Sequence, residues 1–80
     1  MDAELAWDLN DSLFVGPWAV RVSADGTHAT LADPGTLADL REIHGWDPVF
    51  TLRHPDGTRR PVLLGRPADD GTFLVTDLGT

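Results

Sequence analysis

Apolar and polar residues alternate along much of this chain of 80 residues, and the tripeptide Asp-Gly-Thr interrupts the alternation three times. The copies begin at Asp25, Asp56 and Asp70. Alternation predicts strands with one buried face. Asp-Gly favours tight turns because glycine tolerates positive φ and the aspartate side chain bonds back to nearby backbone. The pattern therefore predicts antiparallel strands joined by short turns.

The segment around the first copy predicts a β-hairpin. A two-residue type I′ loop at Asp-Gly pairs Val22 with Ala29 and Val20 with Leu31, which places these four apolar side chains on one face. The same register pairs the flanking Ala24 with Thr27 next to the loop. The polar side chains then share the other face: Arg21, Ser23, His28 and Thr30.

The second copy follows Pro55, which cannot adopt positive φ, so a three-residue loop with a left-handed Gly57 is predicted there. This loop makes Arg53 and Arg59 cross-strand neighbours on one face. The opposite face is apolar and contains Phe50, Leu52, Val62 and Leu64. A last strand from Phe73 to Leu78 completes a three-stranded meander, and two inward faces stay open for it: Phe73 with Val75, or Leu74 with Leu78.

A helix of about nine residues is predicted between the hairpin and the meander. The segment from Thr36 to Asp39 resembles a capping box, apolar residues recur every third position from Leu37, and Gly45 is the expected left-handed stop. The N-terminal segment fits either a helix or an alternating strand. We favour a short helix over residues 2–11.

These elements predict one α+β domain over residues 1–80. Its antiparallel sheet has about five strands, formed by the hairpin and the meander, and the helix packs on one face of the sheet. Because so short a chain buries only about 60–65% of its unfolded surface, a homodimer that covers the other face is also predicted.

The composition excludes several classes of chemistry. Cysteine is absent, which rules out disulfides, thiolate metal sites and thiol nucleophiles. Lysine is also absent, which rules out Schiff bases and a P-loop. No apolar run approaches the roughly 18 residues of a membrane helix, and the N-terminus lacks the basic region of a signal peptide. We therefore expect a cytoplasmic protein with no membrane association and no cofactor.

Charge is unevenly distributed along the chain. The formal net charge is −7, which opposes general attraction to nucleic acid and suits a basic partner. Four arginines nevertheless gather within residues 53–66, and they are Arg53, Arg59, Arg60 and Arg66. With Trp46 as a stacking surface, this arginine island is the candidate contact site for an anion or an acidic partner. Internal pairing with Asp56, Asp69, Asp70 or an acid of the helix is the alternative explanation.

Catalytic and metal-binding patterns are weak. The separations of His28, His44 and His54 match no metal-ligand motif, so we predict no metal site. The chain has two serines, Ser12 and Ser23; neither lies in a nucleophile motif, and Ser23 opposite His28 resembles a catalytic pair only superficially.

We therefore predict a non-enzymatic interaction or accessory module that binds a basic protein partner through its acidic surface. The alternative function is polyanion or nucleic-acid binding through the arginine island. The second alternative is a small enzyme that uses a histidine and an aspartate.

Overall fold

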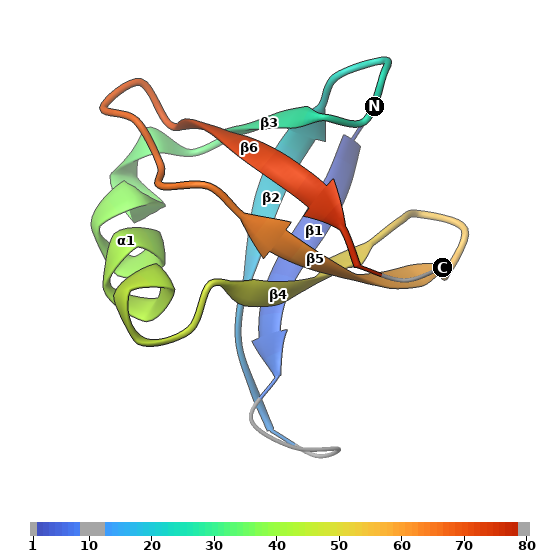
Figure 1. Cartoon of the computed structure of the whole chain (residues 1–80), viewed down its shortest axis with the longest axis horizontal. Coiled ribbons are helices and arrows are strands. Elements are labelled where there is room, and N and C mark those ends of the chain that lie inside the picture. The colour runs from blue at the N-terminus through green and yellow to red at the C-terminus, as the bar shows by residue number, and fades with distance from the viewer. Residues whose placement is uncertain (1, 9–12, 79–80) are drawn as a thin grey trace.

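The computed structural model describes residues 2–8 and 13–78, and within them six antiparallel strands and one α-helix form the fold (Figure 1). The strands are β1 (Asp2–Asp8), β2 (Phe14–Val22), β3 (His28–Leu31), β4 (Val49–Arg53), β5 (Arg59–Leu64) and β6 (Thr72–Asp77). A 3₁₀ turn (Pro34–Thr36) and the helix α1 (Leu37–Trp46) connect β3 to β4. The α+β class is confirmed, with six strands where about five were expected.

The sheet closes into a barrel with the strand order β1-β2-β3-β6-β5-β4, and β4 returns to pair with β1. Closure gives every strand a paired neighbour on both sides, whereas an open sheet would end in two edge strands. It also converts the inward face into the interior of the barrel. The helix α1 lies at one end of this barrel, and the β4–β5 turn lies at the other (Figure 1).

Both predicted hairpin registers are confirmed. In the first hairpin Val20 pairs with Leu31 and Val22 with Ala29, and all four side chains are buried. In the second, Arg53 pairs with Arg59, as the three-residue loop required. The face of β6 that the sequence left open is also settled. Its inward side chains are Phe73 and Val75, and its outward ones include Leu74.

The first turn is not the predicted type I′ turn. That type needs positive φ at both central residues, but Gly26 has φ 74° and no described non-glycine residue has positive φ. The Ser23 amide donates to the His28 carbonyl at 2.8 Å, so Ala24 and Thr27 lie within a four-residue loop rather than forming a pair. The strand register is unchanged because a single left-handed glycine still reverses the chain.

All three Asp-Gly-Thr turns share one hydrogen bond. The aspartate Oδ1 accepts from the backbone amide of the threonine two residues later, at 3.1, 2.8 and 2.9 Å in chain order. The intervening glycines have φ values of 74°, 91° and 84°. The repeated tripeptide is therefore a repeated structural solution to chain reversal.

The N-terminal helix predicted over residues 2–11 is wrong over its described part, because residues 2–8 form β1. Residues 9–11 lie outside the described residues. The strand is favoured over the helix because β1 pairs on both sides, with Glu4 opposite Ala19 of β2 and Arg53 of β4. A short helix would leave the facing edges of β2 and β4 without hydrogen-bond partners.

The helix occupies its predicted position and begins directly after Thr36, but the predicted capping box does not form and the predicted stop at Gly45 is wrong. The Thr36 side chain forms no cap; its hydroxyl donates to the Asp33 carbonyl at 2.7 Å, while Asp33 itself caps the 3₁₀ turn. Gly45 stays helical instead of stopping the helix, and α1 runs one residue further to Trp46. The helix ends where Asp47 becomes extended.

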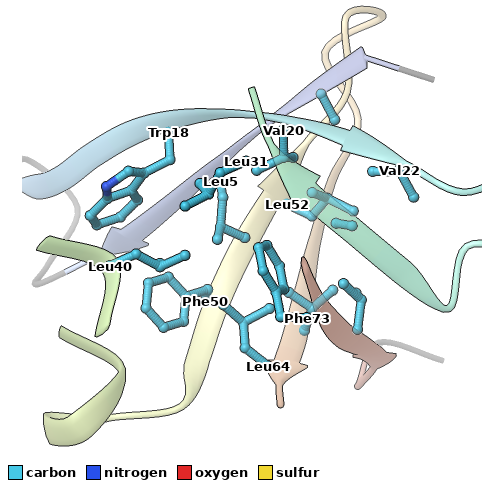
Figure 2. Close-up of a cluster of buried hydrophobic side chains, with 14 of the residues drawn as sticks. Leu5, Trp18, Val20, Val22, Leu31, Leu40, Phe50, Leu52, Leu64 and Phe73 are labelled. Carbon is cyan, nitrogen blue, oxygen red and sulfur yellow. The ribbon is translucent and has the colours of Figure 1, made fainter. Parts of the chain in front are cut away.

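The barrel interior continues into the contact surface of α1. Leu40 is fully buried and lies beside Phe50 and Trp18 at the helix end of the core (Figure 2). The Trp18 and Phe50 rings meet edge to face with centroids 5.9 Å apart. Apolar side chains from every strand and from α1 therefore form one continuous core, as a barrel of this size requires.

Polar contacts fix α1 against the β5–β6 connection. The Arg41 guanidinium donates twice to the Pro67 carbonyl, at 3.2 and 3.0 Å, and once to Asp69 at 2.7 Å. His44 Nε2 donates to the Leu64 carbonyl at 3.0 Å, since a carbonyl only accepts. These contacts, together with Leu40, determine which side of the helix faces away from the barrel.

Candidate functional site

A bulge in β2 shapes the surface beside the helix. Leu5 pairs with Trp18 while Trp7 pairs with Val15, so β2 carries one residue more than β1 between these pairs. Gly16 lies in this bulge with φ 107°, and a Cβ atom there would approach Trp18 Cε3 to 2.9 Å. Glycine is therefore required on both conformational and steric grounds. Pro17 follows it and presents no backbone donor.

The bulge and α1 enclose a groove of about 460 Å³, a volume typical of ligand sites. Its β2 wall is Val15, Gly16, Pro17 and Trp18, and its helical wall is Thr36, Asp39, Glu42, Ile43 and Trp46. Trp18 and Ile43 are buried and form the apolar floor. We call this feature the α1–β2 groove. It combines an apolar floor with two carboxylates and contains no basic residue among those that line it.

The two carboxylates of the α1–β2 groove are not used within the fold. Asp39 and Glu42 are exposed and one helical turn apart. Over residues 2–8 and 13–78 neither has a hydrogen-bond or ion-pair partner, whereas Arg41 between them turns to the β5–β6 connection. Asp39 gains some stability from the N-terminal half-charge of the helix. Glu42, in mid-helix, lacks even that structural explanation.

Trp46 forms one end of the same groove. The residue is 66% exposed, which is unusual for so large an apolar ring. Trp7 meets it edge to face, with centroids 6.3 Å apart and an interplanar angle of 65°. Trp7 is held in turn by a 3.3 Å hydrogen bond from its indole nitrogen to Asp47. The fold thus orients Trp46 but leaves most of its surface uncovered.

The structure keeps Trp46 apart from most of the arginine island. Arg53 and Arg59 lie at the β4–β5 turn, the end of the barrel opposite α1 (Figure 1). Five strand residues separate this turn from the helix, a length of roughly 16 Å at about 3.3 Å per residue. Arg66 is exposed on the β5–β6 connection, at the helix end, where it contributes to lowering the pKa of Asp69. The island is therefore divided between the two ends.

Two arginines at the turn are paired by carboxylates from other strands. Arg53 Nη2 lies 3.6 Å from Asp8 Oδ1, and its guanidinium carbon lies 4.5 Å from the centre of the Phe14 ring. Arg60 Nη1 donates to Asp77 at 3.0 Å. The partner of Arg53 is thus none of the carboxylates expected from the sequence, because β1 was not expected beside β4. Arg59 is exposed opposite Arg53.

Carboxylates elsewhere are stabilised by local donors. Hydrogen bonds from the Ser23 hydroxyl and from Thr27 lower the pKa of Asp25 to about 2. The Thr58 hydroxyl and amide lower the pKa of Asp56. The Arg41 guanidinium holds the pKa of Asp69 below its usual value of 3.8. Each of these acids has a structural role in a turn or in the seating of α1.

The histidines and serines form no catalytic arrangement in the described chain. His28, His44 and His54 lie in β3, in α1 and beside the β4–β5 turn, respectively. The Ser23 hydroxyl donates to Asp25 at 2.6 Å and accepts from the His28 amide, so it is engaged in the turn. Ser12 lies outside the described residues. No group of three or more His, Asp or Glu residues that could hold a metal ion occurs among the described residues.

The site predicted from the sequence did not include Asp39 or Glu42. The available signal was their spacing to Trp46, since residues 39, 42 and 46 lie three and four positions apart and share one helical face. The wall supplied by β2 had no comparable signal. It depends on a bulge that only the pairing of β1 with β2 reveals.

No family model, curated protein or solved structure matches this chain. In the part of the chain that the structure describes, no helix has both the length and the apolar character needed to cross a bilayer.

Proposed function

We propose that this protein is a small interaction module that binds a basic segment of a partner protein in the α1–β2 groove. The observation that carries the proposal is the combination of an apolar floor, an exposed Trp46 and two unpartnered carboxylates in one groove. Each of these features is unfavourable or unused in the isolated molecule. A segment with aliphatic and cationic side chains would use all three at once.

The energetic contributions of the groove differ in kind. Burial of apolar surface supplies most of the affinity, and exposed tryptophans are frequent hot spots at protein interfaces. Asp39 and Glu42 supply charge complementarity, which mainly sets specificity and the rate of association. The net charge of −7 extends the attraction beyond the groove and raises the encounter rate with a cationic partner.

The scaffold favours a fixed binding surface. One wall of the groove is α1, which is attached to the barrel through Leu40, Arg41 and His44. The other wall is the part of β2 from Val15 to Trp18, which is held by its pairing with Leu5 and Trp7 of β1. Both walls are therefore held in place before binding, which reduces the ordering entropy that binding must overcome.

The test is calorimetric titration with an amidated peptide that alternates leucine with arginine or lysine. The double variant Asp39→Asn/Glu42→Gln should weaken binding about five- to tenfold, which corresponds to roughly 1–1.4 kcal/mol. The control Asp2→Asn/Glu4→Gln changes net charge equally on exposed positions of β1 and should weaken binding less than about twofold. Equal losses in both variants would show that only net charge matters.

Salt provides a second, independent measurement. Binding should weaken as ionic strength rises, because the Debye length shrinks to roughly 3 Å at 1 M salt and the charge contribution is screened. Peptide binding that is unchanged at that concentration would contradict the proposal. Titration with an oligonucleotide at low salt tests the alternative function of polyanion binding. If the oligonucleotide binds, and if neutralising Arg59 and Arg66 abolishes that binding, the arginine alternative is correct.

Self-association is a separate prediction. The outer faces of β4, β5 and β6 and the residue after β6 expose four aliphatic residues, between 38% and 55% each: Val49, Leu63, Leu74 and Leu78. A standard interface buries roughly 800 Å² per partner, far more than these four side chains supply. We therefore expect light scattering to find a monomer at low micromolar concentration and any homodimer to be weak.

A further inference from the structure

The α1–β2 groove has a chemical preference that the proposed function does not specify. We infer that it recognises arginine in preference to lysine, with the guanidinium stacked on the Trp46 indole and its edge donating to Glu42. This inference rests on the proposed function, because it names the group that the basic segment places in the groove. It is carried by the positions of three side chains on α1.

The first step concerns the surface of Trp46. Trp7 approaches it edge to face at 65°, so the two rings are not stacked on one another. Because the residue is 66% exposed, ring surface of Trp46 is available to a planar group. Tryptophan is the aromatic side chain that attracts cations most strongly through its ring face. A stacked cation would cover surface that the fold leaves in water.

The second step is the alignment of charge with that ring. Glu42 precedes Trp46 by four residues and Asp39 precedes Glu42 by three, so the three side chains follow one face of α1. Helical side chains lean toward the N-terminus, which directs the indole over the turn that carries Glu42. A cation on the ring is therefore within reach of a carboxylate that has no partner among the described residues.

The third step distinguishes the two cations. A guanidinium is planar and weakly hydrated, so it can stack by its face while its edge donates two parallel hydrogen bonds to a carboxylate. An ammonium is a compact, strongly hydrated charge that presents no flat face to an indole. Beside an apolar floor of Trp18 and Ile43, the less hydrated group loses less on entry. Both effects favour arginine.

The fourth step sets the length of the bound segment. From Thr36 to Trp46 the helical wall spans ten steps, or about 15 Å at 1.5 Å per residue. An extended chain covers that length with four or five residues. Side chains two apart then point to the same side, separated by about 7 Å. An arginine at Trp46 thus places an aliphatic side chain over Ile43 and Pro17.

The experiment uses the intact chain and two amidated pentapeptides, acetyl-Gly-Leu-Ala-Arg-Gly and the same sequence with lysine in place of arginine. Two-dimensional ¹H–¹⁵N NMR titration measures affinities into the millimolar range and reports the indole resonance of Trp46 directly. The arginine peptide should bind at least fivefold more tightly than the lysine peptide. Shifts should concentrate on α1 and on residues 15–18.

Two variants assign the preference to its proposed origin. Trp46→Leu keeps an apolar side chain at an exposed position and should reduce the arginine preference to less than twofold. Glu42→Gln retains the indole and should reduce the preference by a smaller factor. Leu74→Ala, at an exposed site on β6, is the matched control and should leave the preference unchanged.

The outcomes separate this inference from the proposed function. If both peptides bind the groove equally, the arginine preference is wrong while a basic-segment module still stands. If neither peptide produces saturable shifts at α1, both are wrong. If the preference survives Trp46→Leu, stacking on this ring is not its cause and the inference fails.

Discussion

The two ends of the barrel both carry clustered charge, but they use it differently. At the β4–β5 turn, Arg53 and Arg60 are paired with Asp8 and Asp77 from other strands. At the helix end, Asp39 and Glu42 have no partner within the described residues. The sequence drew attention to the arginines because they are close together along the chain. The structure shows that closeness in sequence says little about whether a charge is already satisfied.

The comparison also separates two roles for aromatic residues. Phe14 covers the Arg53 guanidinium at 4.5 Å, so an aromatic ring and a cation are matched within the chain. Trp46 has carboxylates along its helix face and no cation among the residues that line the groove. At the turn end an aromatic ring already has its cation, whereas the groove at the helix end has a ring and carboxylates but no cation among its lining residues. That asymmetry is the physical basis for expecting an external cation at α1.

The largest expected effect comes from loosening the helix. Leu40→Ala removes a fully buried side chain that connects α1 to the barrel core. We expect the free energy of unfolding to fall by about 2–4 kcal/mol, and basic-peptide binding to fall with it as the groove loses its helical wall. Thermal unfolding followed by circular dichroism measures the first, and calorimetry the second.

Leu74→Ala is the control for that experiment, since Leu74 is 55% exposed on the outer face of β6. Its cost should stay within about 0.5 kcal/mol, as for ordinary surface substitutions. If Leu40→Ala melted at the same temperature as Leu74→Ala, the helix would not be seated by its core contact. The argument that the helical wall of the groove is held in place before binding would then fail.

The local elements could be predicted from the sequence because their causes are local. The register around Gly57 followed from a proline and a glycine within three residues, and it placed Arg53 opposite Arg59 correctly. The position and the start of the helix followed from the segment after Thr36 and from the apolar residues that recur from Leu37. Its C-terminal end did not, because Gly45 tolerates helical as well as left-handed geometry.

The barrel closure could not be predicted in the same way. It depends on β1 pairing with β4 and on β3 pairing with β6, which join segments more than 40 residues apart. The N-terminal segment fits both periods, so only the free strand edges decide its structure. The groove could not be predicted for the same reason, because one of its walls is a bulge that forms only where β2 pairs with β1. Asp39 and Glu42 were visible in the sequence, but the surface they face was not.

A smaller effect distinguishes Arg53 from Arg59, its cross-strand neighbour at the β4–β5 turn. Arg53→Gln removes the contacts with Asp8 and Phe14 from a side chain that is only 23% exposed. We expect a loss of about 1 kcal/mol, the sum expected for a partly exposed ion pair and a cation–π contact. Arg59→Gln should be neutral or slightly stabilising, because it removes a like charge directly across the strand pair.

Denaturant titration of both variants measures this difference, and peptide binding provides the link to the helix end. Neither substitution touches the α1–β2 groove, so both variants should bind the basic peptide within about twofold of the parent chain. An equal loss of stability in both variants would mean that Arg59 is also partnered. All three arginines near the turn would then be paired, and Arg59 could not serve as the unpaired counterpart of Asp39 and Glu42.

The smallest expected effect is on the pH dependence of stability, and it comes from the turn between β2 and β3. Donors from Ser23 and Thr27 lower the pKa of Asp25 to about 2 in the folded chain, against about 3.9 in an unfolded one. A lowered folded-state pKa means that the unfolded state binds the proton more readily. The stability that Asp25 contributes is therefore complete above about pH 4 and is lost as the pH falls toward 2. Asp56 and Asp69, whose pKa values are also lowered, act in the same direction.

Asp25→Asn should accordingly flatten the acid side of the stability profile, because asparagine keeps an acceptor for Thr27 but cannot titrate. The measurement is the unfolding midpoint at intervals from pH 2 to pH 7, with Asp2→Asn as the matched control on an 82% exposed side chain. The control should retain the parent slope. A slope in Asp25→Asn as steep as in the control would show that this turn does not hold its carboxylate charged. Hydrogen bonding within the fold would then no longer distinguish the carboxylates of the turns from Asp39 and Glu42 in the groove.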